Sequence, residues 1–200
     1  ELMGLGITPD ILVCRSSAPL NPETRAKLAA FCHVPEEAVI STHDVPNIYH
    51  VPLMLEAQGL CATLGLKVQP NGLLDDWRRM AHHLDALEEN VTIAMVGKYT
   101  DLSDAYLSVI KALQHAAMAA NRKLTIDWLE AGELEHGVPD DVHADAWKRL
   151  RAADGILVPG GFGHRGVEGK ILAASYARTN GVPYFGICLG MQIATIEFAR

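Results

Sequence analysis

A cysteine stands between two glycines in the stretch GICLGMQ, residues 186–192, and this spacing is typical of a nucleophile on a sharp turn. An apolar run precedes Cys188 and a helix-forming stretch follows it, and Gly186 and Gly190 would leave room where strand and helix crowd the turn. The positive end of the helix favours the reactive thiolate, and the N–H of Leu189 would face an oxygen on the attacked carbon. The pattern predicts nucleophilic catalysis by sulfur; a small buried cysteine is the alternative.

A glycine-rich stretch, VPGGFGHRGVEG at 158–169, follows the preceding apolar strand. Gly160 and Gly161 would aim backbone amides into the same crevice as the cysteine and complete an oxyanion hole. A glycine loop alone is weak evidence for a site. The two stretches together, at the carboxyl ends of successive strands, indicate acyl transfer through a thioester at Cys188.

The elements that must position these groups alternate between strand and helix. Residues 91–200 have apolar strand patterns, helical patterns with one apolar stripe, and short polar connections, which predict a doubly wound parallel sheet. The expected strands are 91–97, 123–129, 155–158 and 182–187, and the expected helices are 104–120, 141–152 and 169–180. Ligands of such a fold bind beyond the carboxyl ends of the strands.

The first segment, 1–68, also has a β-α-β-α order. Strands are expected at 10–14 and 38–41 and helices at 21–32 and 51–59, with Asn21 as N-cap, Pro22 at the first helical position and Gly59 as the stop. A connector, 69–90, holds a helical pattern over 73–89, on whose polar side His82 and His83 are expected to face water rather than a metal ion.

Composition excludes several classes of protein. The 200 residues are 49% hydrophobic with a net charge of −7, which fits a globular domain and not a nucleic-acid-binding surface. We find no run long enough to cross a membrane and no secretory signal, so a reduced, cytoplasmic setting is expected. Cys14, Cys32 and Cys61 are expected to be small buried residues. The VGKYT stretch at 96–100 lacks the earlier glycine of a phosphate-binding loop.

The motifs resemble a known family. VPGGFG followed by GICLGMQ resembles the glutaminase domain of class I (triad) glutamine amidotransferases. The longer stretches VGKYTDLSDAYLSVIKAL, PGGFGHRGVEGKI and GICLGMQIATIEFAR resemble CTP synthases, as does RAKLAAFCHVPEEAVISTHDVPNIYHVPLMLEAQGL, with a eukaryotic character. The resemblance implies an α/β chain in which the end of a P-loop-type synthetase domain precedes the first part of a doubly wound glutaminase domain.

The resemblance also implies a reaction. ATP, with Mg²⁺ held by residues outside this chain, would phosphorylate O4 of UTP, and ammonia from L-glutamine would displace the phosphate to give CTP. GTP is the expected activator and CTP the feedback inhibitor. The expected assembly of the full-length protein is a homotetramer that also forms filaments in eukaryotes.

The family's site residues carry over onto matching positions. Cys188 matches the glutaminase nucleophile, Gly161 and Leu189 match amides around the glutamine carbonyl, and Gln192 matches a glutamine contact. Phe162 is expected against the substrate. His164 lies in the stretch that resembles a GTP-responsive lid and does not match the family's base.

The remaining matches are nucleotide contacts. Lys27 matches a UTP and CTP contact, with Phe31 one helical turn on; a solvated charge and a core aromatic are the alternatives. The loop of His43, Asp44 and Val45 matches one that holds the ATP base. The expected lid residues are Arg165, Glu168 and Gly169, and Lys170 is either an anion contact or a solvated charge.

Two further expectations follow from the resemblance. The family's His base and its acidic partner lie well beyond the nucleophile, and its P-loop precedes the first segment, so we expect these 200 residues alone to be inactive. The alternatives are a non-catalytic assembly partner of the full-length enzyme, another glutaminase-coupled synthetase, and a redox sensor on the same elbow.

Overall fold

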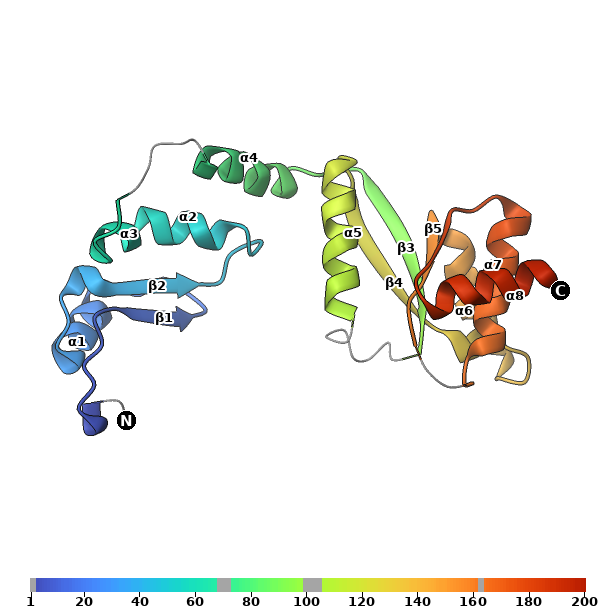
Figure 1. Ribbon diagram of the computed structural model, residues 1–200, viewed down its shortest axis with the longest axis horizontal. Helices are drawn as coiled ribbons and strands as arrows, with labels where there is room; N and C mark the ends of the chain where they lie inside the picture. Colours follow the sequence, from blue (N-terminus) through green and yellow to red (C-terminus); the bar gives the residue numbers. More distant parts are fainter. Residues whose placement is uncertain (1–2, 68–72, 99–105, 162–163) are drawn as a thin grey trace. The chain divides into compact units, whose positions relative to one another are not determined.

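The computed structural model describes residues 3–67, 73–98, 106–161 and 164–200. The chain divides into two compact units, 1–86 and 87–200, and Figure 1 labels their α-helices and the strands β1 to β5. In the described part, no helix is both long and apolar enough to cross a membrane.

The first unit is a small α/β unit built on two parallel strands. Its elements are η1 (Met3–Leu5), β1 (Leu12–Ser16), α1 (Pro22–Cys32), η2 (Glu36–Ala38), β2 (Val39–His43), α2 (His50–Ala57), α3 (Leu60–Thr63) and α4 (Leu73–Asp85). The β1–β2 register runs from Leu12 opposite Val39 to Ser16 opposite His43, so both strands end at the same edge.

Local sequence signals set the helix ends of this unit. The Asn21 side chain accepts a hydrogen bond from the Thr24 N–H at 2.7 Å, which caps α1 as predicted. Helix α2 ends at Ala57, two residues before the predicted end. Gly59 has a φ of +73°, and the chain starts the short helix α3 directly after it. Strand β1 begins at Leu12 and not at residue 10, because its pairing with β2 sets its limits.

The second unit carries the predicted doubly wound sheet. Its elements are β3 (Asn90–Gly97), α5 (Leu107–Ala119), β4 (Lys123–Glu130), η4 (Ala131–Leu134), α6 (Asp140–Ala152), β5 (Gly155–Val158), α7 (Val167–Asn180), β6 (Tyr184–Gly186) and α8 (Leu189–Ala199). The four strands are parallel in the order β4-β3-β5-β6. The predicted α/β fold with parallel strands is therefore confirmed.

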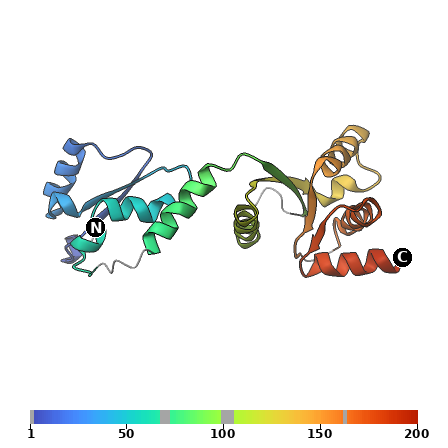
Figure 2. The same cartoon turned by 90° about the horizontal axis from the view of Figure 1, so that it is seen from above.

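Alternation along the central strand β3 divides the core into two layers. Ala94 and Val96 are fully buried on the face covered by α6 and α7, whereas Met95 packs on the opposite face with Val109 of α5 and Trp128 of β4. Helix α5 lies on one side of the sheet and α6 and α7 on the other (Figure 2). Because β5 and β6 are adjacent and parallel, the loops after them leave the same edge of the sheet.

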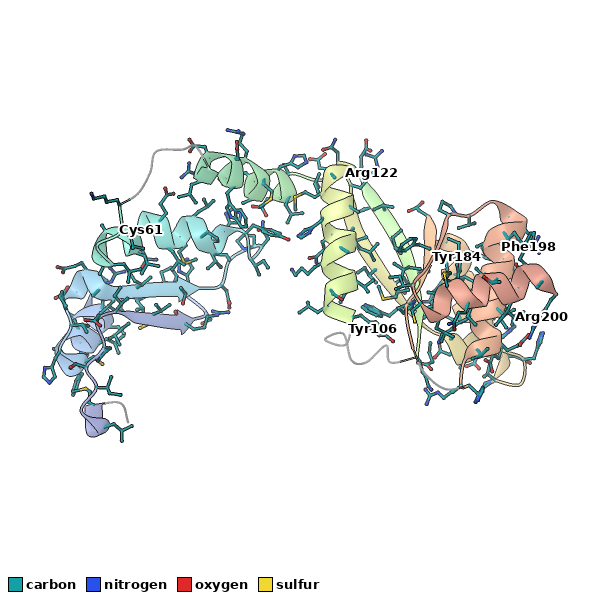
Figure 3. All side chains as sticks on the ribbon, viewed as in Figure 1. Cys61, Tyr106, Arg122, Tyr184, Phe198 and Arg200 are labelled. Atoms are coloured by element: carbon teal, nitrogen blue, oxygen red, sulfur yellow. The ribbon has the colours of Figure 1, made fainter. Side chains whose placement is uncertain are left out.

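The structure tests two predictions about side-chain exposure, one for three cysteines and one for two histidines. Cys14 and Cys32 are half-buried, but Cys61 on α3 is exposed, so the prediction of burial is wrong for Cys61 (Figure 3). Cys61 lies on α3, which is only one turn long, follows Gly59 directly and contains no buried residue. His82 and His83 are exposed, as expected from the polar side of the helical pattern.

Candidate active site

Cys188 occupies a backbone conformation that non-glycine residues rarely adopt. Its φ is +53° and its ψ is −103°, and it is the N-cap residue of α8, two residues after the end of the short strand β6. Such strain at a strand-to-helix turn is a feature of functional sites. The side chain is exposed, so the thiol is accessible and lies at the positive end of the helix.

Gly186 and Gly190 make this turn possible because no side chain fits at either position. A Cβ on Gly186 would lie 2.4 Å from the backbone of Gly190, and a Cβ on Gly190 would lie 2.0 Å from the carbonyl oxygen of Val158. Helix α8 therefore approaches the end of β5 at backbone contact. The sequence predicted glycines at these two positions because strand and helix crowd the turn, and the structure shows this crowding.

The loop after β5 reaches the cysteine. A Cβ on Gly160 would lie 3.6 Å from Cβ of Cys188, and a Cβ on Gly161 would lie 3.7 Å from the Leu189 side chain. The structure therefore brings the two predicted halves of the oxyanion site side by side. Phe162 lies outside the described residues.

Gln192 lies on the first turn of α8 beside the cysteine. Its N–H donates to the carbonyl oxygen of Cys188 at 3.2 Å, which closes this turn, and its side chain is exposed. Leu189 packs against the cluster of Ile171, Ala174 and Ile193 and ties the start of α8 to α7. The exposed glutamine amide is thus available to a ligand held at the thiol.

Two side-chain contacts hold α8 in place. The Tyr184 hydroxyl donates to the carbonyl oxygen of Gly190 at 2.8 Å, and burial raises the pKa of this phenol to about 12. Arg178 of α7 donates two hydrogen bonds of 2.8 Å to the carboxylate of Glu197 on α8. The Arg178 hydrogen bond holds the pKa of Glu197 below its usual range. Neither contact was foreseen, because each joins positions with no recognisable sequence pattern.

The expected lid residues are spread over a turn and a helix. Arg165 pairs with Glu130 at 2.9 Å, at the carboxyl end of β4. Glu168 is in the first turn of α7 and forms two hydrogen bonds with Arg200 at the end of α8. Helix α7 begins at Val167, two residues before the predicted start, so it includes Glu168 and the following glycine.

Gly169 is required for packing. A Cβ there would lie 1.7 Å from the carbonyl oxygen of Ala131, and its N–H donates to the Glu135 carboxylate at 3.0 Å. His164, in the turn before α7, is exposed.

Lys170 differs most from its expected surroundings. Its side chain is only 2% exposed, so it is not the solvated charge that the sequence left open. Its Nζ lies behind the glycine loop, where a Cβ on Gly161 would be 3.9 Å away. Burial lowers the pKa of this amine, and Lys98 lowers it further, whereas Glu130 opposes both effects. The sequence around Lys170 is an ordinary helical pattern, and it does not indicate that this side chain is buried.

The predicted nucleotide contacts lie in the first unit. Lys27 and Phe31 are one turn apart on α1, and Phe31 is 80% exposed, which excludes the alternative of a core aromatic. Lys27 is also exposed and stands one turn before this ring. An exposed aromatic ring can stack on a planar base, and a lysine one helical turn away can pair with an anionic group of the same ligand.

The loop of His43, Asp44 and Val45 begins at the carboxyl end of β2. Among the described residues, no group hydrogen-bonds the buried Nδ1 of His43. Asp44 forms an exposed ion pair with Arg15 of β1, and Val45 is half-buried. An unpaired buried nitrogen costs about 1–3 kcal/mol, so this position favours a ligand that supplies the missing partner.

The fold and the cysteine elbow define an α/β glutamine amidotransferase domain. The class-I glutamine amidotransferase family matches residues 101–200, and the CTP synthase N-terminus matches residues 1–69. The glutaminase domain of Trypanosoma brucei CTPS with bound acivicin superposes with a TM-score of 0.50 at 47% identity, over 56% of this chain and 41% of that one.

Relatives extend the match over the whole chain. CTP synthase of Dictyostelium discoideum is 49% identical over 220 residues, and CTP synthase 1 of Homo sapiens is 48% identical over 209 residues. Both alignments include all of this chain but only 39% and 35% of the respective relative. The chain belongs to the CTP synthase family, and it spans little more than a third of the length of these relatives.

Proposed function

We propose that this chain is the central part of a CTP synthase that makes CTP from UTP, ATP and glutamine. The observation that supports this most directly is Cys188, held at a φ of +53° on an elbow beside the loop of Gly160 and Gly161. The nucleotide contacts predicted on α1 and after β2 belong to the synthetase half of the same reaction. Mg²⁺, a cytoplasmic location and assembly into tetramers or filaments are part of the proposal for the full-length protein.

The thiolate of Cys188 attacks the side-chain carbonyl carbon of glutamine and forms a carbon–sulfur bond. The N–H groups of Gly161 and Leu189 stabilise the oxyanion of this intermediate. Breaking the carbon–nitrogen bond releases ammonia and leaves a glutamyl thioester, which water then hydrolyses to glutamate. A base and an acidic partner from later in the full-length protein move the protons.

The released ammonia completes the synthetase step. ATP phosphorylates O4 of the uracil ring, ammonia attacks C4, and phosphate leaves to give CTP. Lys27 and Phe31 bind the pyrimidine nucleotide in this proposal, and the loop from His43 to Val45 binds the ATP base. Arg165, Glu168 and Gly169 are the residues through which GTP acts. The 200 residues alone are expected to form no CTP, because base and nucleophile act as a unit.

Covalent labelling tests the assignment of the nucleophile. The full-length protein is treated with acivicin, the compound bound in the trypanosome structure. Peptide mass spectrometry should then find the adduct at Cys188 and not at Cys61, which is also exposed. Glutamine should protect the site. Equal labelling of both cysteines would indicate simple accessibility, and oxidation of Cys188 without labelling would favour a redox sensor.

A further inference from the structure

A cluster of two histidines and an aspartate joins α2 to α4 within the first unit, and it contains none of the residues assigned above. His50 is the first residue of α2, and His82 and Asp85 lie one turn apart near the end of α4. Their candidate ligand atoms all lie within 4.8 Å of one another. The His50 Nε2 is 2.6 Å from the Asp85 carboxylate, and the two imidazole rings are 5.2 Å apart between centroids.

Neighbouring contacts fix the two helices that carry these side chains. The Trp77 indole N–H donates to the backbone carbonyl of Tyr49 at 2.7 Å, and the two rings pack edge to face. Arg78 of α4 pairs with Glu56 of α2 at 2.9 Å. The ligands are therefore brought together by helix packing, which is how a protein prepares a site in advance.

The carboxylate also has an orienting partner. The Asn47 side-chain amide donates to the second carboxylate oxygen of Asp85 at 2.6 Å and reaches the backbone carbonyl of Ala81 at 3.3 Å. This leaves one oxygen of Asp85 turned toward His50. Partners of this kind, behind the atoms that bind an ion, orient ligands in metal sites.

We propose that His50, His82 and Asp85 bind one divalent transition-metal ion, with Zn²⁺ as the best-suited class, and that the ion fastens α4 to α2. Imidazole nitrogen and carboxylate oxygen are ligands of zinc, and in a tetrahedral site they stand roughly 3.3 Å apart. Where ligand atoms of the cluster lie farther apart than this, rotation of the exposed His82 side chain brings its ring nitrogen closer to the other two ligands. Solvent occupies the fourth position, so this is a site open to exchange.

From the sequence alone, His82 was expected to face water, because the proposed ligand His50 is far from it along the chain. His83, its neighbour in sequence, lies outside the cluster, whereas His50 is 32 residues earlier and is brought close only by the packing of α4 on α2. An ion pair between His50 and Asp85, without a metal, is the alternative that the experiment must exclude.

Cobalt is the probe, because tetrahedral Co²⁺ has visible absorption bands that zinc abolishes by competition. The full-length protein is stripped with a chelator and titrated with Co²⁺ in the absence of nucleotide. We expect one equivalent per chain to give these bands. His82→Ala and Asp85→Asn should weaken binding at least about tenfold, since even changes to orienting partners cost about 10–100-fold.

The control is His83→Ala, which removes an exposed histidine from the same helix and should bind cobalt like the wild type. Far-UV circular dichroism checks that each variant is folded. Zn²⁺ should also slow hydrogen exchange over 73–85 in the wild type and not in His82→Ala. Cobalt binding that is absent, or equal in the wild type and His82→Ala, would overturn the proposal and leave a simple ion pair.

Discussion

At the level of single residues, the site depends on positions where no side chain can be accommodated. The sequence pattern identified Gly186 and Gly190 beside Cys188 because crowding at a nucleophile elbow has a fixed spacing. It could not show that Gly169 is crowded, because that crowding comes from Ala131 in a distant part of the chain. It also gave no indication that Lys170 is buried. Local spacing predicts local turns, whereas contacts between remote segments become visible only in the fold.

The first prediction concerns Gly190. In Gly190→Ala, the new methyl group would lie 2.0 Å from the carbonyl oxygen of Val158, so α8 must move away from β5. We expect a loss of about 3 kcal/mol in unfolding free energy, near the upper end for overpacking, together with loss of glutamine hydrolysis. Chemical denaturation of the full-length protein measures the change.

The control for this prediction is Gly132→Ala. Its added Cβ has no atom within 4 Å and its φ is not positive, so its stability should stay within about 0.5 kcal/mol of the wild type. A Gly190→Ala variant as stable as the control would show that the elbow tolerates a side chain.

At the level of elements, α7 supports α8, the helix whose N-cap residue is Cys188. Helix α8 contacts α7 through Leu189 and Ile193 and is fastened by the Arg178–Glu197 pair, whose carboxylate is only 7% exposed. The sequence predicted α7 from its helical pattern and α8 from the elbow motif around Cys188. It did not predict this pair, because Arg178 has the pattern of a solvated charge.

The second prediction is a pH dependence of stability from this pair. The folded pKa of Glu197 lies below its ordinary value of 4.5, mainly through the hydrogen bond from Arg178. The pair therefore contributes stability above the unfolded pKa, and this contribution is lost as the pH falls through the folded pKa. Glu197→Gln should be less stable than the wild type at about pH 7, and the difference should shrink toward about pH 4.

Denaturant midpoints at the two pH values test this prediction, with Glu168→Gln as the matched control. Glu168 also pairs with an arginine, but its side chain is 53% exposed, so solvent screens the pair and the change should be smaller. A difference for Glu197→Gln that stays constant with pH would show that the lost packing, and not the charge, matters.

At the level of the whole molecule, the chain combines parts of two chemistries. The second unit holds Cys188, the proposed glutaminase nucleophile, and the first unit holds the residues proposed for UTP and ATP. Periodicity and capping predicted the alternation of strands and helices along both units well, because apolar strands and capped helices are local signals. Nucleotide contacts such as Lys27 and Phe31 came from family resemblance alone, since a lysine and a phenylalanine on a helix have no distinctive pattern.

The most direct test of the account separates the two chemistries in the full-length protein. Cys188→Ala removes the nucleophile and leaves the synthetase residues untouched, so CTP formation is measured with glutamine and then with ammonium chloride. We predict that the glutamine-supported rate falls at least about a thousandfold and that the ammonia-supported rate is unchanged. A glutamine-supported rate that survives in Cys188→Ala, or a wild-type protein that makes no CTP from either nitrogen source, would contradict the account.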